Sequence, residues 1–371
     1  MKKTEYKPIV VISGVNLVEA GPLSVFKDAI HSFIQNFSDS YTLVLLVNNR
    51  NLFKEFNESG DIRFISFAYP KKMWLLRVWF EYVHCYFISK KIKPYLWFAM
   101  HDMSPKVVAE NQVVYCHNPA AFYKFTLREF WYEKSLFFFK YFYTVFYRIN
   151  IKSNKFVIVQ QDWLRKIFEK KFNIHNIIVA YPDIKALNVT HQYHAQKPYP
   201  VKFIYPAMPR VFKNYEVLFS AAKKLSKSDL DFEVLATIDG TENKYSHHLK
   251  KKYYNVANIK FIGLRSRDEL FRLYAQCNCL VFPSKLETWG LPVTEMKYFN
   301  KPILVANAAY AAETVGDYDK VCFFKENNAE ELSNLMKGII KKTIKFHPVQ
   351  KKQIDPPFSN SWKELLTIIT Q

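Results

Sequence analysis

The feature that most constrains the fold is a regular alternation of short, uniformly apolar runs with longer helical patterns. Such runs are typical of strands buried on both faces, and helices between them indicate a parallel sheet covered on both sides. The runs before residue 182 are Ile9–Ser13, Thr42–Val47, Arg63–Phe67, Leu96–Met100, Val113–Cys116 and Phe156–Gln160. The first helical pattern, Leu23–Phe37, follows Gly21-Pro22, and proline suits a first helical turn. The first half of the chain therefore predicts a doubly wound α/β domain.

The alternation restarts after a polar, proline-punctuated stretch, Pro182–Pro200, which we interpret as a linker. The later predicted strands are Val201–Tyr205, Phe232–Thr237, Ile259–Gly263, Cys279–Phe282 and Ile303–Ala306, with helices beginning near Asn214, Lys244, Arg267 and Gly290. A chain of 371 residues suits two domains. We expect two Rossmann-like doubly wound parallel-sheet domains, residues 1–182 and 199–350, that face a cleft at the carboxyl ends of their strands. Residues 357–371 predict a short helix that packs back on the first domain, because it is too short to be stable alone.

The net charge of +20 comes from 53 Lys and Arg residues against 33 Asp and Glu residues. A basic surface favours nucleic acid, anionic lipid or a phosphate-bearing substrate. Nucleic-acid binding stays an alternative, although the chain has no helix-turn-helix, zinc-finger, RRM or KH signature. Basic and aromatic residues cluster over 137–148 and at Lys71, Lys72, Trp74, Arg77, Trp79, Lys90, Lys91 and Lys93. These clusters indicate either core aromatics with solvated charges or contact with an anionic membrane.

Targeting signals are missing from the sequence. The apolar part of the N-terminal stretch MKKTEYKPIVVISG is only about five residues long, too short for a secretory signal. No uncharged apolar segment is long enough to cross a membrane. We therefore expect a cytoplasmic protein, at the inner face of the cell membrane if the basic aromatic clusters bind lipid.

The sharpest local signal is a pair of glutamates spaced eight residues apart, Glu287 and Glu295. Glu287 follows a predicted strand end, Gly290 opens a helix, and Glu295 falls one to two turns into that helix. Helix N-termini bind phosphates and hydroxyls well, because their backbone N–H groups are free. A carboxylate at the strand end can accept hydrogen bonds from sugar hydroxyls, and the second can reach a ribose. Taken alone, acidic residues near a helix start are ordinary.

A second signal lies after the first strand of the second domain, where Arg210 and Lys213 are three residues apart on a loop that enters a helix. An arginine fork and a lysine point charge can together clamp a diphosphate. The other interpretation is a solvated basic loop in a basic protein.

The region around the glutamate pair resembles the retaining glycosyltransferases of family 4, also called glycosyl transferases group 1, which have the GT-B fold. The motifs that match are Phe282-Pro283-Ser284, Glu287, Gly290-Leu291-Pro292, Glu295 and Lys301-Pro302. The chain departs from the pattern at Met296, where alanine is usual, and at Asn300, where glycine is usual. Asparagine tolerates left-handed geometry, so the helix end can survive. The resemblance is specific over about residues 200–320 and weaker over 1–180.

The resemblance implies roles for individual residues. His117 ends a strand where the family carries a histidine that faces the transferred sugar. Residues 97–105 and 159–164 resemble stretches of bacterial members that build surface polysaccharides. The implied catalytic residues are His117, Glu287, Lys213 and Arg210; the donor-binding residues are Gly21, Gly263, Gly290, Leu291 and Glu295; and His101, Asp102 and Asn118 are candidates at the acceptor side of the cleft.

The implied activity is transfer of a hexose from a UDP- or GDP-sugar to a hydroxyl of a saccharide acceptor, with retention of anomeric configuration. The expected setting is surface polysaccharide, O-antigen or capsule biosynthesis, with a polyprenyl-diphosphate-linked acceptor and no nucleic acid. We expect no resident cofactor and no metal, because Asp317-Tyr318-Asp319 resembles a metal-binding DxD motif only in its letters and falls outside a strand-to-strand loop. Another GT-B enzyme, such as a phosphorylase, stays an alternative, although no pyridoxal-phosphate lysine motif is evident.

Overall fold

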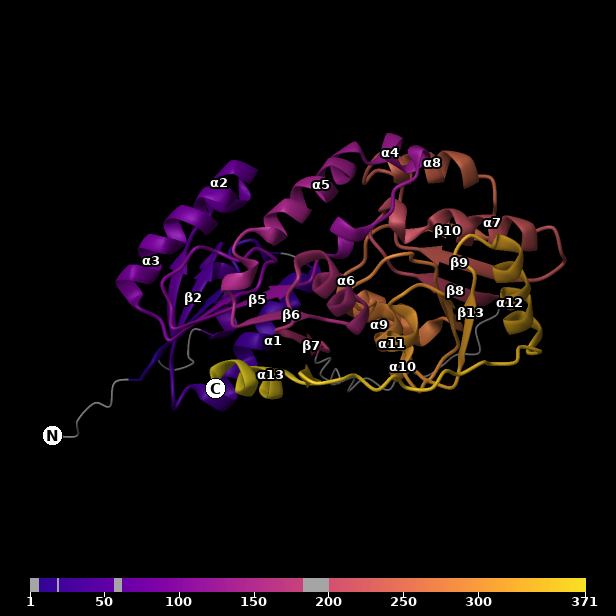
Figure 1. Ribbon diagram of the computed structural model, residues 1–371. Coiled ribbons are helices and arrows are strands. Elements are labelled where there is room, and N and C mark those ends of the chain that lie inside the picture. The colour runs from indigo at the N-terminus through magenta and orange to yellow at the C-terminus, as the bar shows by residue number, and fades with distance from the viewer. Residues whose placement is uncertain (1–6, 19, 57–61, 183–199) are drawn as a thin grey trace. The chain divides into compact units, whose positions relative to one another are not determined.

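The computed structural model describes residues 7–18, 20–56, 62–182 and 200–371, and these form two compact units (Figure 1). Unit 1 holds Met1–Asn118, Tyr141–Asp183 and Ile354–Gln371, and unit 2 holds Pro119–Lys140 and Ile184–Gln353. The division predicted from sequence, 1–182 and 199–350, does not contain the excursion of Pro119–Lys140 into unit 2. The predicted linker lies outside the described residues, apart from its two ends.

Unit 1 is built on an eight-stranded sheet in which each strand pairs in parallel with its neighbours, in the order β14-β7-β6-β5-β4-β1-β2-β3. Its strands are β1 (Ile9–Ser13), β2 (Thr42–Val47), β3 (Ile62–Ser66), β4 (Leu96–Ala99), β5 (Asn111–Cys116), β6 (Phe156–Val159), β7 (Ile177–Ala180) and β14 (Phe358–Ser359). The chain proceeds from β1 outward through β2 and β3 and then crosses to β4 on the other side. The switch point of this sheet therefore lies between β1 and β4, where open α/β sheets bind ligands.

Helices cover this sheet and complete its core. They are α1 (Ala20–Phe37), η1 (Arg50–Phe56), η2 (Tyr69–Lys71), α2 (Trp74–Trp79), the π-helical turn η3 (Phe80–His84), α3 (Cys85–Ile92), the end of α5 (Lys134–Arg148), η5 (Ile151–Ser153), α6 (Asp162–Phe172) and α13 (Trp362–Thr370). The core joins inward residues of β1, β2 and β4 to α1 and to Trp362, Leu366 and Ile369 of α13. Because the apolar face of α13 is buried there, the last helix belongs to unit 1 although it follows unit 2 in the sequence.

The returning C-terminal segment is tied to unit 1 by backbone contacts. Strand β14 extends the sheet beside β7. The Arg165 guanidinium donates to the carbonyl oxygens of Asp355, at 2.7 Å, and Pro357, at 2.9 Å. The Tyr95 hydroxyl donates to the carbonyl oxygen of Thr370 at 3.0 Å. These bonds satisfy carbonyl groups that a free chain end would leave to water.

Unit 2 is built on a six-stranded sheet, also with parallel pairs throughout, in the order β10-β9-β8-β11-β12-β13. Its elements are η4 (Pro119–Phe122), α4 (Leu127–Tyr132), the start of α5, β8 (Val201–Tyr205), η6 (Val211–Lys213), α7 (Tyr215–Leu225), β9 (Phe232–Ala236), α8 (Lys244–Tyr253), β10 (Ile259–Phe261), α9 (Arg267–Gln276), β11 (Cys279–Phe282), α10 (Leu291–Tyr298), β12 (Ile303–Ala306), α11 (Ala311–Val315), β13 (Val321–Phe324) and α12 (Ala329–Lys341). Its switch point lies between β8 and β11.

The predicted fold class is confirmed, since both units are doubly wound parallel sheets of the Rossmann-like kind. Several predicted strands match to the residue, among them β1, β2, β8, β11 and β12. Three strands were not predicted: β7, β13 and the two-residue β14. No described helix is both long and apolar enough to pass through a bilayer.

Candidate functional site

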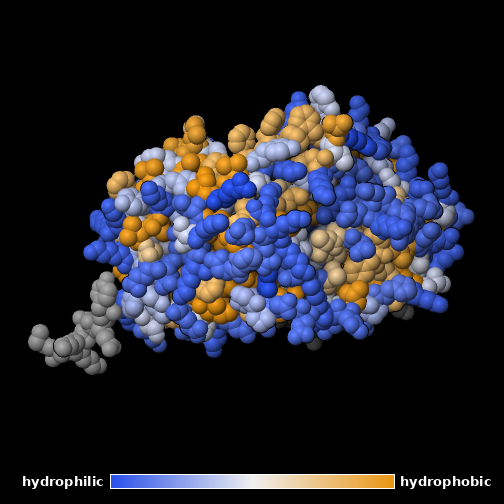
Figure 2. Space-filling model, in the orientation of Figure 1, coloured by the Kyte–Doolittle hydropathy of each residue, from blue (hydrophilic) through white to orange (hydrophobic). Residues whose placement is uncertain are grey.

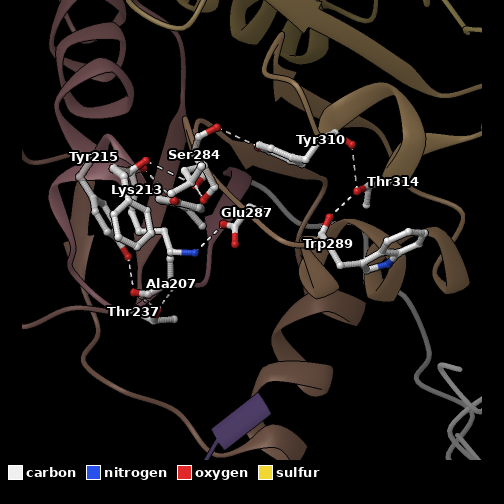
Figure 3. A network of polar contacts seen from close by, with 12 residues as sticks. Ala207, Lys213, Tyr215, Thr237, Ser284, Glu287, Trp289, Tyr310 and Thr314 are labelled. Atoms are coloured by element: carbon white, nitrogen blue, oxygen red, sulfur yellow. Dashed lines mark hydrogen bonds and ion pairs between the residues drawn. The ribbon is translucent and has the colours of Figure 1, made fainter. Parts of the chain in front are cut away.

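The candidate site lies at the switch point of unit 2, where the loops after β8 and β11 meet (Figure 3). The first loop, residues 206–214, is held to the sheet by hydroxyl groups. Tyr215 donates to the carbonyl oxygen of Ala207 at 2.6 Å, and the backbone N–H of Ala207 donates to the Thr237 hydroxyl at 3.1 Å. Tyr205 donates to the carbonyl oxygen of Lys213 at 2.8 Å. The backbone that carries the predicted basic pair is therefore fixed before any ligand binds.

The turn into α7 joins the two loops. Asn214, between η6 and α7, has a left-handed backbone with φ of 56°, which asparagine adopts more readily than most residues. Its buried amide donates to the carbonyl oxygens of Pro283, at 3.1 Å, and Glu326, at 2.7 Å. The backbone N–H of Lys285 donates to the carbonyl oxygen of Phe212 at 2.8 Å. These bonds bring the end of η6 against the loop that follows β11.

A largely buried ion pair in the site joins Lys213 to Glu287. Their Nζ and Oε1 atoms are 2.5 Å apart, and the side chains are only 17% and 13% exposed (Figure 3). Both charges are thus largely removed from water, and a partner lost at such a contact leaves the other charge poorly solvated. The sequence predicted both residues for the site, and the structure brings them into direct contact.

Two further cations of unit 2 are paired with carboxylates. Arg210 Nη1 lies 3.2 Å from Glu133 Oε1, and Lys285 Nζ lies 3.4 Å from Glu129 Oε1. Glu133 also accepts the backbone N–H of Val211 at 3.2 Å. Each of these cations already has a carboxylate partner. A diphosphate that binds here therefore competes with those carboxylates for the cations.

Gly290 sets the start of α10. Its φ of +92° is a left-handed conformation that disfavours other residues, and a Cβ placed there would lie 3.2 Å from the Phe282 ring. The helix begins at the next residue, Leu291, which is partly buried. Its N-terminal end, with its positive dipole, therefore follows Glu287 by a few residues. Asn300, beyond the other end of α10, has φ of +52°, as the sequence predicted for a residue in the place of glycine.

Glu295 lies on α10 and is buried. The Tyr274 hydroxyl of α9 donates to its Oε2 at 2.9 Å. Burial raises the pKa of Glu295, against the opposing effects of the Tyr274 hydrogen bond and the Arg267 charge. Glu295 thus lies on the helix that Gly290 precedes, and it contacts α9 rather than Lys213. Gly263, after β10, has φ of +72°, and a Cβ there would be in ordinary van der Waals contact with Asp239, 3.6 Å away.

The residues predicted in the first half of the chain lie on unit 1. Asp102, just beyond β4, is buried with φ of +72° and accepts hydrogen bonds from the backbone N–H groups of His117, at 2.7 Å, and Asn118, at 3.0 Å. The hydroxyls of Tyr143 and Tyr147 also donate to it, at 2.8 and 3.0 Å. Burial alone raises the pKa of Asp102, but His117, the Tyr143 hydroxyl and Arg77 outweigh it, so the pKa is lowered. Asp102 is therefore a buried anion whose hydrogen bonds position the backbone of His117 at the end of β5.

His101 lies at the switch point of unit 1 in a buried polar chain. Its Nε2 is 3.2 Å from the Ser13 hydroxyl and its Nδ1 is 3.2 Å from Glu81 Oε1. Burial and the Arg77 charge lower the pKa of His101 to about 3. Burial raises the pKa of Glu81 to about 8, although Arg77 opposes the shift. Both groups are therefore neutral near pH 7, and neither His101 Nδ1 nor a Glu81 carboxyl oxygen has a hydrogen-bond partner among the described residues. Gly21 lies apart from this chain, in the first turn of α1.

Some residues of these sites were not predicted. Glu129 forms a capping box with Thr126, a pattern that can be read in sequence, but its contact with Lys285 cannot. Glu133 and Glu81 carry no local signal, because their partners are remote in the chain or depend on burial. The DxD-like residues Asp317 and Asp319 are exposed between α11 and β13. In the described part of the chain, no three metal-binding side chains are grouped so as to hold an ion.

Comparison with known proteins places the site in a family domain. Residues 190–353 match the family described as glycosyl transferases group 1. A glycosyltransferase of uncharacterised function from Methanocaldococcus jannaschii is 27% identical over 128 residues, which cover 34% of this chain and 35% of that protein. The chain thus matches about a third of the length of that curated relative.

Solved structures match over nearly the whole chain. A glycosyltransferase from Rickettsia africae matches with a TM-score of 0.65 and 17% identity, over 91% of this chain and 89% of that one. The Anabaena protein HepE, solved with UDP-glucose, matches with a TM-score of 0.61 and 14% identity, over 91% of this chain and 90% of that one. At such identities the likeness shows the fold. The chain therefore has the GT-B fold, and its residues 190–353 match the family glycosyl transferases group 1.

Proposed function

We propose that this protein transfers a hexose from a UDP- or GDP-sugar to a hydroxyl of a saccharide acceptor, with retention of anomeric configuration. The observation that carries the proposal is the Lys213–Glu287 contact at the switch point of the group 1 domain. A cation and a carboxylate at that edge of the sheet suit a ligand with a diphosphate at one end and hydroxyls at the other. The UDP-glucose bound by HepE is a ligand of this chemistry.

The proposed chemistry uses the chain's own side chains to stabilise the leaving group. Lys213 and Arg210 neutralise the diphosphate as its bond to the sugar breaks, and Glu287 accepts hydrogen bonds from sugar hydroxyls. The acceptor oxygen bonds to the anomeric carbon on the same face, and its proton passes to the leaving phosphate oxygen. His117, on unit 1, faces the transferred sugar in this proposal. The retention and the histidine role rest on the family resemblance.

The proposed acceptor is an oligosaccharide linked to polyprenyl diphosphate, in surface polysaccharide, O-antigen or capsule biosynthesis. Two observations support it: the resemblance of residues 97–105 and 159–164 to enzymes that build such polymers, and a net charge of +20, which suits an anionic membrane. A lipid-linked acceptor requires contact with the inner face of the cell membrane.

The first experiment is a thermal-shift panel of UDP-, GDP-, ADP- and dTDP-sugars with the full chain. We expect UDP- or GDP-sugars to raise the melting temperature, because binding to the folded state alone stabilises it. The stabilising donor is then tested for transfer to a saccharide, with the anomeric configuration of the product read by NMR. Stabilisation by none of these donors contradicts the proposed function, and inversion at the anomeric carbon contradicts retention alone.

The same assay tests whether a metal ion takes part. We expect transfer to continue in EDTA, because Lys213 and Arg210 can balance the charge of the diphosphate. Loss of transfer in EDTA, restored by Mg²⁺ or Mn²⁺, contradicts that expectation and leaves the donor assignment standing.

A further inference from the structure

Large apolar side chains are exposed mainly in two stretches of the described chain. Of the seventeen large apolar residues that are exposed, twelve lie within 73–87 and 127–149. Figure 2 shows such residues gathered over α2 and α5. Folded proteins rarely expose many large apolar groups together unless that surface binds something.

The first stretch forms a stripe along the continuous helical segment α2–η3–α3. Leu75, Trp79, Val83 and Phe87 recur every four residues and are all exposed, Leu75 to 72% and Phe87 to 62%. In a regular α-helix this spacing drifts by about 40° at each step. The π-helical turn η3 holds more residues per turn and so counteracts the drift. The stripe therefore keeps to one side of the segment.

The second stripe lies on the end of α5 within unit 1, at Tyr141, Phe142 and Val145, and continues to Ile149 just after the helix. The opposite face of this helix holds Tyr143 and Tyr147, the buried partners of Asp102. The Trp74 ring joins the two helices, with its centroid 6.0 Å from that of Tyr143 and 5.0 Å from that of Phe146. The two stripes thus lie on neighbouring helices of one unit, and we call them together the apolar face.

Trp74 and Arg77 belong to the basic aromatic cluster identified from the sequence, but the structure turns them inward. Trp74 packs against α5, and the Arg77 guanidinium donates to the carbonyl oxygen of His101 at 2.6 Å. The residues that remain available to a partner are therefore the stripe and its flanking lysines. This selection could not be made from the sequence, because both sides of the segment are apolar.

The exposed charges within residues 71–93 and 141–152 are all positive. Exposed cations flank the apolar face at Lys71, Lys72, Lys90, Lys91, Lys93, Arg148 and Lys152. Residues 71–93 contain a single carboxylate, Glu81, which is buried, and residues 141–152 contain none. A second copy of this chain would bring like charges together at the face. An anionic lipid surface complements both the charge and the apolar stripe.

We propose that the apolar face docks on an anionic membrane, with the α2–η3–α3 segment and the end of α5 lying along the interface. The inference deepens the proposed function and rests on it for the lipid-linked acceptor. It names the surface and the partner: a bilayer that contains acidic phospholipid, entered by the stripe and held by the flanking lysines.

The test is sedimentation of the full chain with vesicles of phosphatidylcholine, with and without phosphatidylglycerol. We expect binding to the mixed vesicles that weakens as salt rises, and little binding to phosphatidylcholine alone. Leu75→Glu/Trp79→Glu/Phe87→Glu should reduce partitioning into mixed vesicles by roughly 100-fold, because anchors are lost and like charges repel. The control, Tyr254→Glu, changes an exposed aromatic residue of unit 2 and should bind as the wild type does.

Each other outcome overturns the proposal: no binding of the wild type to mixed vesicles, unchanged binding of the triple variant, or equal loss in the control. A wild-type dimer in analytical ultracentrifugation that the triple variant abolishes assigns the face to a second copy instead. Should the triple variant unfold, Phe87→Glu carries the same test. Binding of UDP and GDP, and transfer to a soluble saccharide, are measured without vesicles, so failure of the function is seen separately from failure of the docking face.

Discussion

Replacing Glu287 by glutamine should tighten the binding of bare UDP or GDP while it lowers sugar transfer. The Lys213 ammonium is 2.5 Å from the Glu287 carboxylate. A diphosphate that uses Lys213 must therefore compete with that carboxylate, and Glu287→Gln removes the competing charge. Transfer should fall nonetheless, since the variant loses the anionic acceptor proposed for the sugar hydroxyls.

The size of the effect follows from the burial of the pair. A hydrogen bond to a charged group contributes about 1.5–3 kcal/mol. Glutamine keeps a neutral hydrogen bond to Lys213, and the pair is not wholly removed from water. We therefore expect the binding free energy of UDP or GDP to improve by roughly 1 kcal/mol, which is about five-fold tighter binding. Lys213→Ala should act in the opposite direction, weakening the diphosphate by about 10- to 100-fold and lowering turnover by on the order of 100-fold.

Isothermal calorimetry with UDP and GDP measures these changes directly. The matched control is Glu330→Gln, which breaks an exposed ion pair of the same unit, Lys224–Glu330, whose atoms are 2.6 Å apart. An exposed pair is stabilising by little, so this variant should bind the nucleotides as the wild type does. Weaker or unchanged nucleotide binding in Glu287→Gln would refute the competition between carboxylate and diphosphate. Unchanged binding in Lys213→Ala would remove Lys213 from the donor site.

Three further predictions concern single residues. Glu295→Gln should weaken UDP or GDP by roughly 1–3 kcal/mol if the carboxylate holds the ribose; calorimetry measures it, and an unchanged affinity contradicts that role. Gly290→Ala should destabilise the protein to urea by about 1–3 kcal/mol, because φ is +92° and the Phe282 ring is close. The control Gly338→Ala, in the interior of α12, should be neutral or stabilising, and equal effects of the two changes contradict the strain. Glu81→Gln tests pH dependence, because burial raises the pKa of Glu81 in the folded protein to about 8. The folded protein therefore keeps Glu81 neutral, and this stability is fully present below the pKa of the unfolded state. It is lost as the pH rises towards 8, because the unfolded chain then ionises more readily than the folded one. The wild type should lose on the order of 4 kcal/mol relative to Glu81→Gln between pH 4.5 and 8, and parallel pH profiles of unfolding free energy contradict the shift.

Much of the sheet architecture could be predicted from residue pattern. The strands Ile9–Ser13 and Cys279–Phe282 match their apolar runs to the residue. Strand β7, which has four apolar residues next to the predicted linker, was not predicted. The left-handed backbone of Asn300 was expected from the family resemblance, because glycine is usual at this place and asparagine tolerates the same geometry.

The loops of the candidate site could be found from sequence, but the pairing of their charges could not. Arg210, Lys213 and Glu287 were recognised by residue type and position after a strand. Their ion-pair partners depend on the path of the chain. Glu133 lies beside Arg210 only because residues 119–140 pack within unit 2. A periodic pattern predicts an element and its faces, and it carries no information on which distant element covers a face.

The sequence by itself determined the two doubly wound sheets, the loops that follow β8 and β11, and the glycine that starts α10, because each depends on local periodicity or on a local backbone conformation. Only the tertiary structure decided which side is buried in a helix that is apolar on both sides. It also decided which carboxylate pairs with which cation. Trp74 and Leu75 are adjacent and equally apolar, yet one packs against α5 and the other is exposed. The physical reason is that burial belongs to the packed layers as a whole: a side chain is removed from water by residues remote in sequence, and so its environment, its pKa and its partner are properties of the fold.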